Sequence, residues 1–292
     1  MPRSAGSDRP LLVIDGDNLA HRAYHSIPKS LRSKDGRPIN AIVGWTNMVL
    51  YLWESEQPRA IYVAWDTLGV DTYRHRLWPP YQAGRVFDKS IVRQLDLLPR
   101  LAAAFGFGVG KAPGYEADDF MAAAAAAETR RGGHSLLLTT DRDAYQLASE
   151  QVTILAPRAG IRDLLRIGPE EVVARLGVLP EQVPDYKALA GDASDNIPGA
   201  RGIGPKAAAS LLLQYGDLEG VLAARAASMP PGLAEQLRLF RDVVHMRGHE
   251  LTVELPPSGP PRWAEAAEEL ARLGADNLSE RVAALATASG RT

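Results

Sequence analysis

Nine carboxylates stand where they could serve one chemical site. Three of them, Asp15, Asp66 and Asp141, each follow a short strand-like run of mostly apolar residues. The other six lie in tight clusters: Glu116, Asp118 and Asp119; Asp143 beside Asp141; and Asp192 with Asp195. So many like charges in one place raise the pKa of each carboxyl and destabilise the fold unless cations neutralise them. The acids therefore predict a divalent-cation site.

The chemistry of that site is limited by the absence of cysteine, which leaves oxygen and histidine as ligands. Oxygen ligands completed by water suit Mg²⁺ or Mn²⁺. Two such ions roughly 3.5–4 Å apart can activate water and stabilise the leaving oxygen of a phosphodiester, so no nucleophilic side chain is needed. An aspartate after a strand is often only a helix cap or turn former. A turn or capping role of this kind is our interpretation of Asp17. It is a poorer explanation of Asp15, Asp66 and Asp141 taken together.

Strand-like and helical patterns alternate in the first half of the chain. We expect strands at residues 10–15, 60–66, 135–141 and 152–155, and helices at residues 39–55, 90–105 and 116–131. This alternation predicts an open α/β sheet. Ligands bind beyond the carboxyl ends of the strands in such sheets, so the three strand-following aspartates are expected around one crevice.

The character of the sequence changes at about Leu164. From there we expect helices joined by short turns, with no convincing strand before Glu250, and a final amphipathic helix or two after a proline-rich stretch. We therefore divide the chain into an α/β catalytic domain, residues 1–163, and a helical C-terminal domain, residues 164–292.

A glycine hairpin stands between two helical patterns of the second domain, at about residues 196–210. Its central residues are Gly202, Ile203, Gly204 and Lys206. Glycines allow close approach of the backbone, and the N–H groups at the start of the next helix can hold a phosphate. The hairpin predicts a grip on the sugar-phosphate backbone without base reading. A plain turn between helices is the alternative.

Cations and aromatic rings are mixed between Tyr73 and Arg85, directly after the second expected strand. Aromatic faces stack on bases while arginines hold phosphates, as single-strand binding requires, although a solvated basic surface is the common alternative. The net charge of −2 does not itself favour a nucleic-acid partner. However, 27 of the 33 basic residues are arginine, which suits phosphate contacts. Genomic base composition is the other explanation of that bias.

Taken in order, these motifs resemble the 5′-3′ exonuclease and flap endonuclease family, which includes the N-terminal domain of bacterial DNA polymerase I. The similar region runs from about Leu11 to about Leu285, and its most specific pieces are Tyr115-EADD, Thr140-DRD and Gly191-DASDNIPG. The resemblance implies a PIN-like α/β domain with an arch over the active site. It also implies a helix-three-turn-helix domain that binds duplex DNA, often with K⁺ in the hairpin.

The resemblance also implies roles for individual residues. The residues around a first metal site would be Asp15, Asp66, Glu116, Asp118 and Asp119, and those around a second would be Asp141, Asp143, Asp192 and Asp195. The residues near the scissile phosphate and the frayed 5′ strand would be Arg22, Tyr24, Arg74, Tyr81 and Arg85. The residues of the duplex-binding hairpin would be Gly202, Gly204 and Lys206. The division between the two metal sites is approximate.

One position departs from the family pattern. Gln82 stands where the family usually has a lysine that contacts the reacting phosphate, which removes a positive charge from the environment of the transition state. We expect reduced turnover, unless Arg74 or Arg85 compensates. The segment from Val86 to Val92 is short, and its one basic residue is Lys89, so the arch is expected to carry less charge than usual.

The expected partner is branched or flapped double-stranded DNA with a free 5′ end, RNA-primed ends included. A cytoplasmic location is expected, because neither a membrane span nor a secretory signal is visible. The resemblance implies a monomer. The chain ends where a polymerase I would continue, which favours a stand-alone enzyme, and a fragment of a longer protein is the alternative. Two rival hypotheses are a weakly active or inactive DNA-junction binding protein of the same fold, and a phosphatase of the haloacid dehalogenase type suggested by Asp15-GDN.

Overall fold

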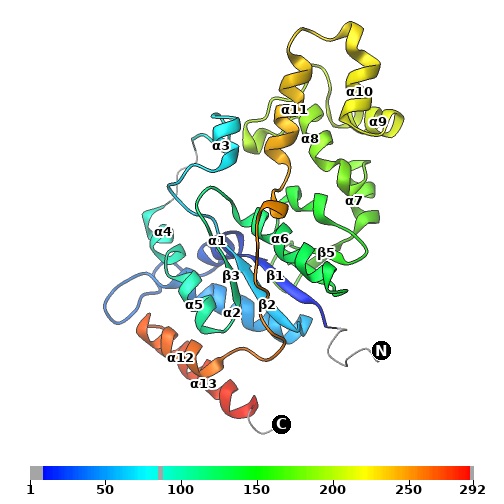
Figure 1. Cartoon of the computed structure of the whole chain (residues 1–292). Coiled ribbons are helices and arrows are strands. Elements are labelled where there is room, and N and C mark those ends of the chain that lie inside the picture. Colours follow the sequence, from blue (N-terminus) through cyan, green and yellow to red (C-terminus); the bar gives the residue numbers. More distant parts are fainter. Residues whose placement is uncertain (1–8, 85–87, 290–292) are drawn as a thin grey trace, which may run out of the picture.

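A six-stranded sheet organises the α/β part of the protein (Figure 1). The computed structural model describes residues 9–84 and 88–289. The strands, in sheet order, are β3 Gly108–Gly110, β2 Ala60–Ala64, β1 Leu11–Asp15, β4 Ser135–Leu138, β5 Val152–Pro157 and β6 Leu164–Ile167. β1 to β5 run parallel, and β6 pairs antiparallel with β5. The carboxyl ends of β1, β2 and β4 therefore meet at one edge.

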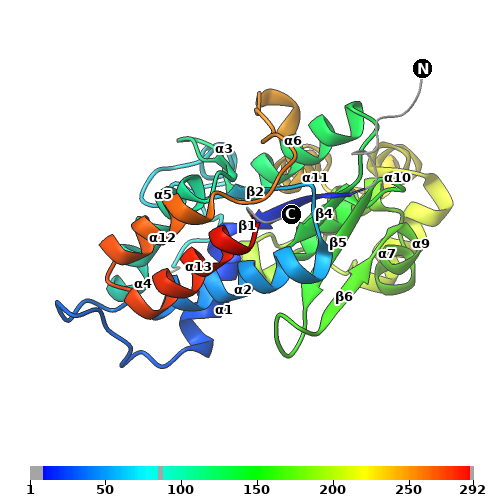
Figure 2. The same cartoon turned by 90° about the horizontal axis from the view of Figure 1, so that it is seen from below.

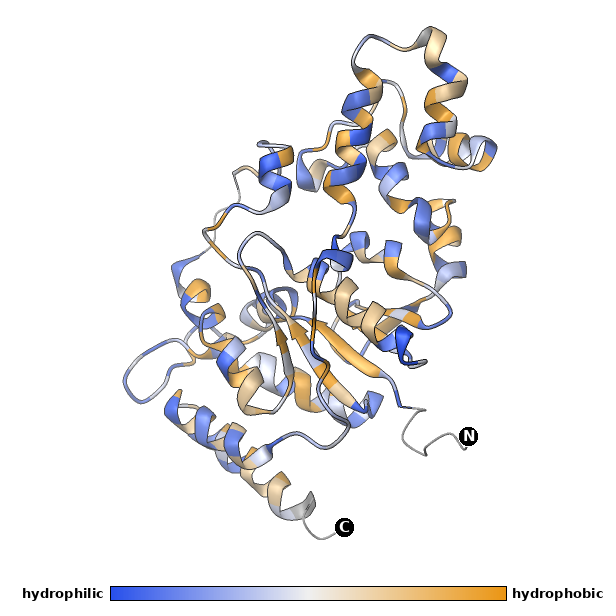
Figure 3. Ribbon diagram, in the orientation of Figure 1, coloured by the Kyte–Doolittle hydropathy of each residue, from blue (hydrophilic) through white to orange (hydrophobic). Residues whose placement is uncertain are grey.

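Helices cover both faces of this sheet (Figure 2). One face carries α6 Ala117–Arg130; the other carries α1 Gly16–Ser26, α2 Asn40–Glu56, α4 Lys89–Leu95, α5 Leu98–Ala104, α12 Trp263–Arg272 and α13 Asp276–Ser289. Successive residues of β1 point to opposite faces. Leu11 and Val13 enter the core beneath α6, whereas Leu12 and Ile14 enter the core on the other side. The strands accordingly carry hydrophobic colours in Figure 3.

A group of smaller helices lies beyond the carboxyl edge of the sheet (Figure 1). They are α7 Pro169–Leu176, α8 Val183–Ala190, α9 Pro205–Tyr215, α10 Leu218–Arg225 and α11 Leu233–Val244. The short α3, Tyr73–Leu77, packs against α11. Short 3-10 helices connect these parts: η1 Arg142–Leu147, η2 Pro180–Gln182, η3 Ala193–Asp195, η4 Ala226–Ser228 and η5 Gly248–Glu250.

The structure confirms the α/β class and the helical second part, with three corrections to the expected elements. The expectation of no strand between residues 164 and 250 is wrong, because Leu164–Ile167 forms β6. The expected helix at residues 90–105 is two helices, since Pro99 opens α5 after a break. β3 was not expected at all. The division at residue 163 stays a prediction. α12 and α13 belong to the second part in that division, yet they pack against the sheet core.

The arch implied by the resemblance falls between α3 and α4. Residues 85–87 of that segment, Arg85 among them, lie outside the described residues. Among the helices that the structure describes, none is both long enough and apolar enough to cross a bilayer.

Candidate active site

A crevice of about 240 Å³ opens at the carboxyl edge of the sheet. Its acidic lining consists of Asp15, Asp17, Asp66, Glu116, Asp118, Asp141 and Asp143. Six of these seven are among the nine predicted acids. A neighbouring hollow of about 540 Å³ is lined by Asp141, Asp192 and Asp195, so Asp141 faces both spaces. The convergence that the sequence predicted is thus present for eight of the nine acids.

Asp15 stands at the centre of this edge, at the end of β1. Its carboxylate caps α1 by accepting a hydrogen bond from the Asn18 N–H at 3.0 Å, and it accepts a second from the Thr139 hydroxyl at 2.9 Å. Burial, together with the charges of Asp66 and Asp141, raises the pKa of Asp15 to about 7. The cap alternative is therefore also correct for this residue, but capping one helix does not account for the convergence of seven acids on the crevice.

Asp66 and Asp17 are held against one another beside Asp15. The Asp66 N–H donates to the Asp17 carboxylate at 2.7 Å, and the Asp66 carboxylate accepts from the N–H of Ala117 at the start of α6 at 2.8 Å. Burial and the charge of Asp66 raise the pKa of Asp17 well above its ordinary value. Asp17 therefore belongs to the acidic lining, where the sequence interpretation gave it only a turn or capping role.

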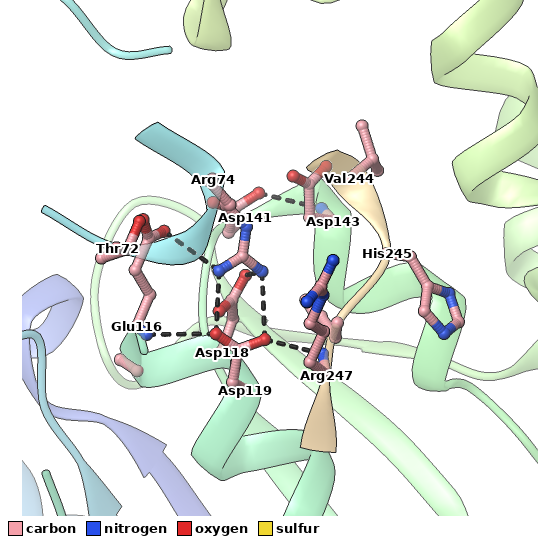
Figure 4. A network of polar contacts seen from close by, with 12 residues as sticks. Thr72, Arg74, Glu116, Asp118, Asp119, Asp141, Asp143, Val244, His245 and Arg247 are labelled. Atoms are coloured by element: carbon pink, nitrogen blue, oxygen red, sulfur yellow. Dashed lines mark hydrogen bonds and ion pairs between the residues drawn. The ribbon is translucent and has the colours of Figure 1, made fainter. Parts of the chain in front are cut away.

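The start of α6 carries three acids that surround the guanidinium of Arg74: the N-cap Glu116, and Asp118 and Asp119 in the first turn (Figure 4). Arg74 Nη1 lies 2.8 Å from Asp119 Oδ2, and Arg74 Nη2 lies 2.9 Å from Asp118 Oδ2. Glu116 is more distant, at 3.5 Å, and accepts hydrogen bonds from the hydroxyls of Thr72 and Tyr81. A negative charge in the first turn of a helix is favourable, and Arg74 offsets the remaining repulsion.

Two members of this group do not face the crevice. Asp119 is fully buried, and it accepts hydrogen bonds from Arg74, from the Tyr73 hydroxyl and from the backbone N–H groups of Glu116 and Arg247. Arg74 is 1 % exposed and also donates to the carbonyl of Val243. The structure thus places Arg74 beneath the acids and outside the lining of the crevice. We propose that both residues position Glu116 and Asp118 and do not contact metal or phosphate.

A second cation, Lys187 of α8, lies among the acids on the other side of the crevice. Its ammonium is 2.6 Å from Asp192 Oδ2 and also contacts Asp143, which follows β4. Burial would raise the pKa of Asp192, but Lys187 and Ser194 more than offset this effect and lower it. Burial raises the pKa of the neighbouring Asp195. The second group of acids is therefore assembled from two separate parts of the chain around one lysine.

Tyr81 and Gln82 connect the two groups. The Tyr81 hydroxyl donates to Glu116 at 3.0 Å, while the Gln82 amide contacts the Tyr81 oxygen at 2.7 Å and donates to Asp195 at 3.0 Å. Both side chains line the crevice. Gln82 adopts a left-handed backbone conformation, with φ of 47°. The position that departs from the family pattern is thus inside the acid cluster, where a charge would act directly on the site.

The carboxylates of the crevice are the ligand type that divalent cations prefer, but their present arrangement does not enclose an ion. Among their oxygens, Asp118 Oδ1 is buried without a hydrogen-bond partner although the residue lines the crevice. Within the described ranges, no group of three or more histidine or acid side chains is arranged to hold an ion as it stands. Arg74 and Lys187 account for this, because they already engage five of the acids. Cation binding therefore requires local rearrangement of these contacts.

The predicted hairpin does lie between two helices, α8 and α9. Gly202 has φ of 81°, a left-handed conformation that favours glycine, and Gly204 caps α9 without a side-chain hydrogen bond. Lys206, in the first turn of α9, is exposed. Ile203 is half-buried and packs against the core, so it anchors the turn. The N–H groups at the start of α9 are therefore available for a phosphate.

The remaining predicted DNA contacts have other partners in the structure. Tyr24 is 2 % exposed, and its hydroxyl donates to Asp88 at 2.6 Å. Arg22 donates to the carbonyls of Pro157 and Arg158, at the end of β5, and lines a separate shallow pocket. Tyr24 therefore holds Asp88 at the start of α4, whereas Arg22 lines a pocket on the surface.

Sequence reasoning missed Lys187 and the hydrogen-bonding residues Asn18 and Thr139. Asn18 donates to the hydroxyl of Thr140 at 2.7 Å, which ties the first turn of α1 to the end of β4. Thr139 could have been recognised from the sequence, because it stands directly before the Thr140-DRD motif. Lys187 carried a weaker signal, a single lysine five residues before Asp192 on a helix.

The fold and the site define a class: a resolvase-like α/β domain with acids along its carboxyl edge, joined to a small helical domain. Residues 10–177 match the family model "5'-3' exonuclease, N-terminal resolvase-like domain", and residues 178–253 match "5'-3' exonuclease, C-terminal SAM fold". The chain belongs to the 5′-3′ exonuclease family.

Relatives and solved structures agree with this assignment. The DNA polymerase I of Mycobacterium tuberculosis is 39% identical over 214 residues, 73% of this chain and 24% of that protein. The thermostable DNA polymerase I of Thermus thermophilus is 35% identical over 246 residues, 84% of this chain and 28% of that protein. The chain spans about a quarter of the length of these relatives.

Two solved structures share the fold over nearly the whole chain. The bacteriophage T5 flap endonuclease, in a pseudo-enzyme-product complex with DNA and metal ions, has a TM-score of 0.64 at 21% identity, covering 96% of this chain and 100% of that one. The catalytic core of Rad2 in complex with DNA substrate has a TM-score of 0.56 at 15% identity, covering 94% of this chain and 93% of that one.

Proposed function

We propose that the protein is a structure-specific 5′ nuclease, a metal-dependent 5′-3′ exonuclease and flap endonuclease. The observation that supports this most strongly is the convergence of eight acids on two neighbouring spaces at the carboxyl edge of the sheet. Family membership points the same way. The substrates would be 5′ flaps and 5′ ends, RNA primers included, that arise in DNA replication and repair.

Each part of the chain has a distinct task in this proposal. Two divalent cations, Mg²⁺ or Mn²⁺, would supply water activation and charge neutralisation when bound. Asp15, Asp66 and Asp118 would hold the first, with Glu116 acting through water, and Asp141, Asp143, Asp192 and Asp195 would hold the second. Tyr81 and Gln82 would orient Glu116 and Asp195 through their hydrogen bonds.

The hairpin would supply affinity for duplex DNA. Backbone N–H groups at the start of α9 and the ammonium of Lys206 would contact phosphates, which gives binding without sequence specificity. K⁺ bound in the hairpin, a monomeric state and a cytoplasmic location remain predictions. They do not affect the chemistry proposed for the crevice.

The test is cleavage of a 5′-labelled flap beside matched blunt duplex and single strand, each with Mg²⁺, Mn²⁺ or EDTA. We expect metal-dependent cutting near the flap base that Asp141→Ala abolishes. Asp96→Ala, which removes an exposed carboxyl at the end of α4, is the matched control and should cut like the wild type.

The same experiment decides between the nuclease and a junction-binding protein of the same fold. Gln82, which contributes no positive charge to the crevice, is the observation that favours the second function. Tight binding of the flap substrate without cutting in either metal would establish the binding protein and rule out the nuclease.

A further inference from the structure

Lys187 holds together two acids that belong to different parts of the molecule. Asp143 comes from η1, directly after β4, and Asp192 from the segment that precedes the hairpin. The Lys187 ammonium is 2.6 Å from Asp192 Oδ2 and contacts Asp143 as well. Lys187 is 8 % exposed, so water screens this contact only weakly. A single cation thus occupies the space between two acids of the second group.

Arg74 is the other buried counter-ion described above, and more contacts hold it in place. Its guanidinium is held by Asp118 and Asp119, and its Nε donates to the carbonyl of Val243. Lys187, in contrast, presents one ammonium on a flexible four-carbon stem. Lys187 also lines the hollow of about 540 Å³, so open space adjoins its side chain. Lys187 can therefore move where Arg74 cannot.

We propose that Lys187 is a built-in counter-ion that competes with a divalent cation for Asp143 and Asp192. This inference rests on the proposed metal-dependent function. The ammonium neutralises the two carboxylates in the metal-free protein and keeps the two parts of the chain in register. A cation binds at the second site once the ammonium has moved aside, so Lys187 sets the affinity of that site and makes it lower than that of the first. Lys187 is a positioning residue in this scheme, because it acts through the two acids.

Removing the competitor should strengthen cation binding. A lysine charge within about 4 Å of an incoming cation opposes binding, and the carboxylates left without it repel each other until a cation arrives. Both effects act in the same direction. We expect Lys187→Met to lower the second dissociation constant for Mn²⁺ about tenfold or more.

The experiment is a titration of DNA-free protein with Mn²⁺, with the free ion counted by electron paramagnetic resonance. The chains are the wild type, Lys187→Met, Lys187→Gln, Lys187→Arg and the control Lys34→Met. Lys34 forms an exposed ion pair with Asp276, so the control removes a similar contact at a distance from the crevice. Lys187→Gln provides a second neutral variant if the methionine variant does not fold.

We expect the wild type, Lys187→Arg and Lys34→Met to bind one Mn²⁺ tightly and a second weakly, and the neutral variants to bind both with similar affinity. An unchanged or weaker second site in a folded neutral variant would overturn the competition while leaving the nuclease proposal intact. A wild type that binds no Mn²⁺ would instead overturn the metal-dependent function and this proposal with it.

Discussion

The two groups of acids around the crevice are built in opposite ways. The first is a contiguous piece of sequence, Glu116 to Asp119, at the start of one helix, with the buried Arg74 beneath it. The second gathers Asp141 and Asp143 from one end of the sheet and Asp192 and Asp195 from the segment before the hairpin, with Lys187 between them. The acids of the first group are brought together by one helix start, whereas those of the second come together only when the helical part sits correctly against the sheet.

This difference predicts that the two groups of acids respond differently to binding. A group on one helix, held by a buried arginine, is expected to keep one arrangement whatever the helical part binds. A group shared between two parts of the chain can respond to what the helical part binds.

Arg74→Ala should break the first group. The substitution leaves Asp119 buried without its cation, which is expected to lower the free energy of unfolding by about 3–5 kcal/mol. Urea denaturation measures the change. Arg76→Ala, an exposed arginine of the same short helix, should change stability by less than about 0.5 kcal/mol. Equal effects of the two substitutions would show that Arg74 is not the anchor of this group.

The free energy of unfolding of the metal-free protein should fall as pH rises, because the pKa of Asp15 is raised in the folded state. The folded protein keeps the proton on Asp15 up to about pH 7, whereas the unfolded chain releases it near 3.8, so the free energy of unfolding falls between these values. Because Asp15 faces the crevice, we expect a loss on the order of 2–4 kcal/mol relative to Asp15→Asn. Denaturation in EDTA from pH 4 to pH 8 provides the measurement. Parallel pH profiles for the wild type and Asp15→Asn would contradict the prediction.

Gln82→Lys should strengthen the second group's role in catalysis. An ammonium beside Asp195 and Tyr81 restores a positive charge near the reacting phosphate, and we expect the single-turnover rate on a flap to rise about tenfold. Gln82→Met, neutral and of similar length, should not exceed the wild type. An unchanged rate for the lysine variant would show that the missing charge does not matter.

Asn196→Gly should loosen the joint between the two parts of the chain. The Asn196 amide donates to the carbonyls of Pro80 and Ala83, and its left-handed φ of 56° suits glycine. The substitution therefore removes these bonds without backbone strain and should cost about 1 kcal/mol. Hydrogen exchange should become faster at residues 81–84 and remain unchanged in β1. Unaltered exchange at residues 81–84 would show that these bonds do not restrain the segment.

Much of the sheet and of the first acid group could be predicted from the sequence because their signals are local. Buried parallel strands appear as short apolar runs, and each strand-following aspartate marks the carboxyl edge. The elements that were missed depend on distant partners. Gly108–Gly110 has poor strand propensity and becomes β3 by pairing with β2, where Tyr62 leaves no room for side chains at Gly108 and Gly110. Leu164–Ile167 becomes β6 by pairing with β5.

Residue types and their spacing were sufficient to predict which acids are present, the α/β class, the hairpin and the family. Which of the candidate residues face the crevice depended on how distant segments pack together. The tertiary structure buried Arg74, Asp119 and Tyr24, admitted Asp17 to the acidic lining and placed Lys187 between Asp143 and Asp192. The physical reason is that residue type and spacing fix what a side chain can do, whereas its partners and its exposure depend on segments far away in the chain.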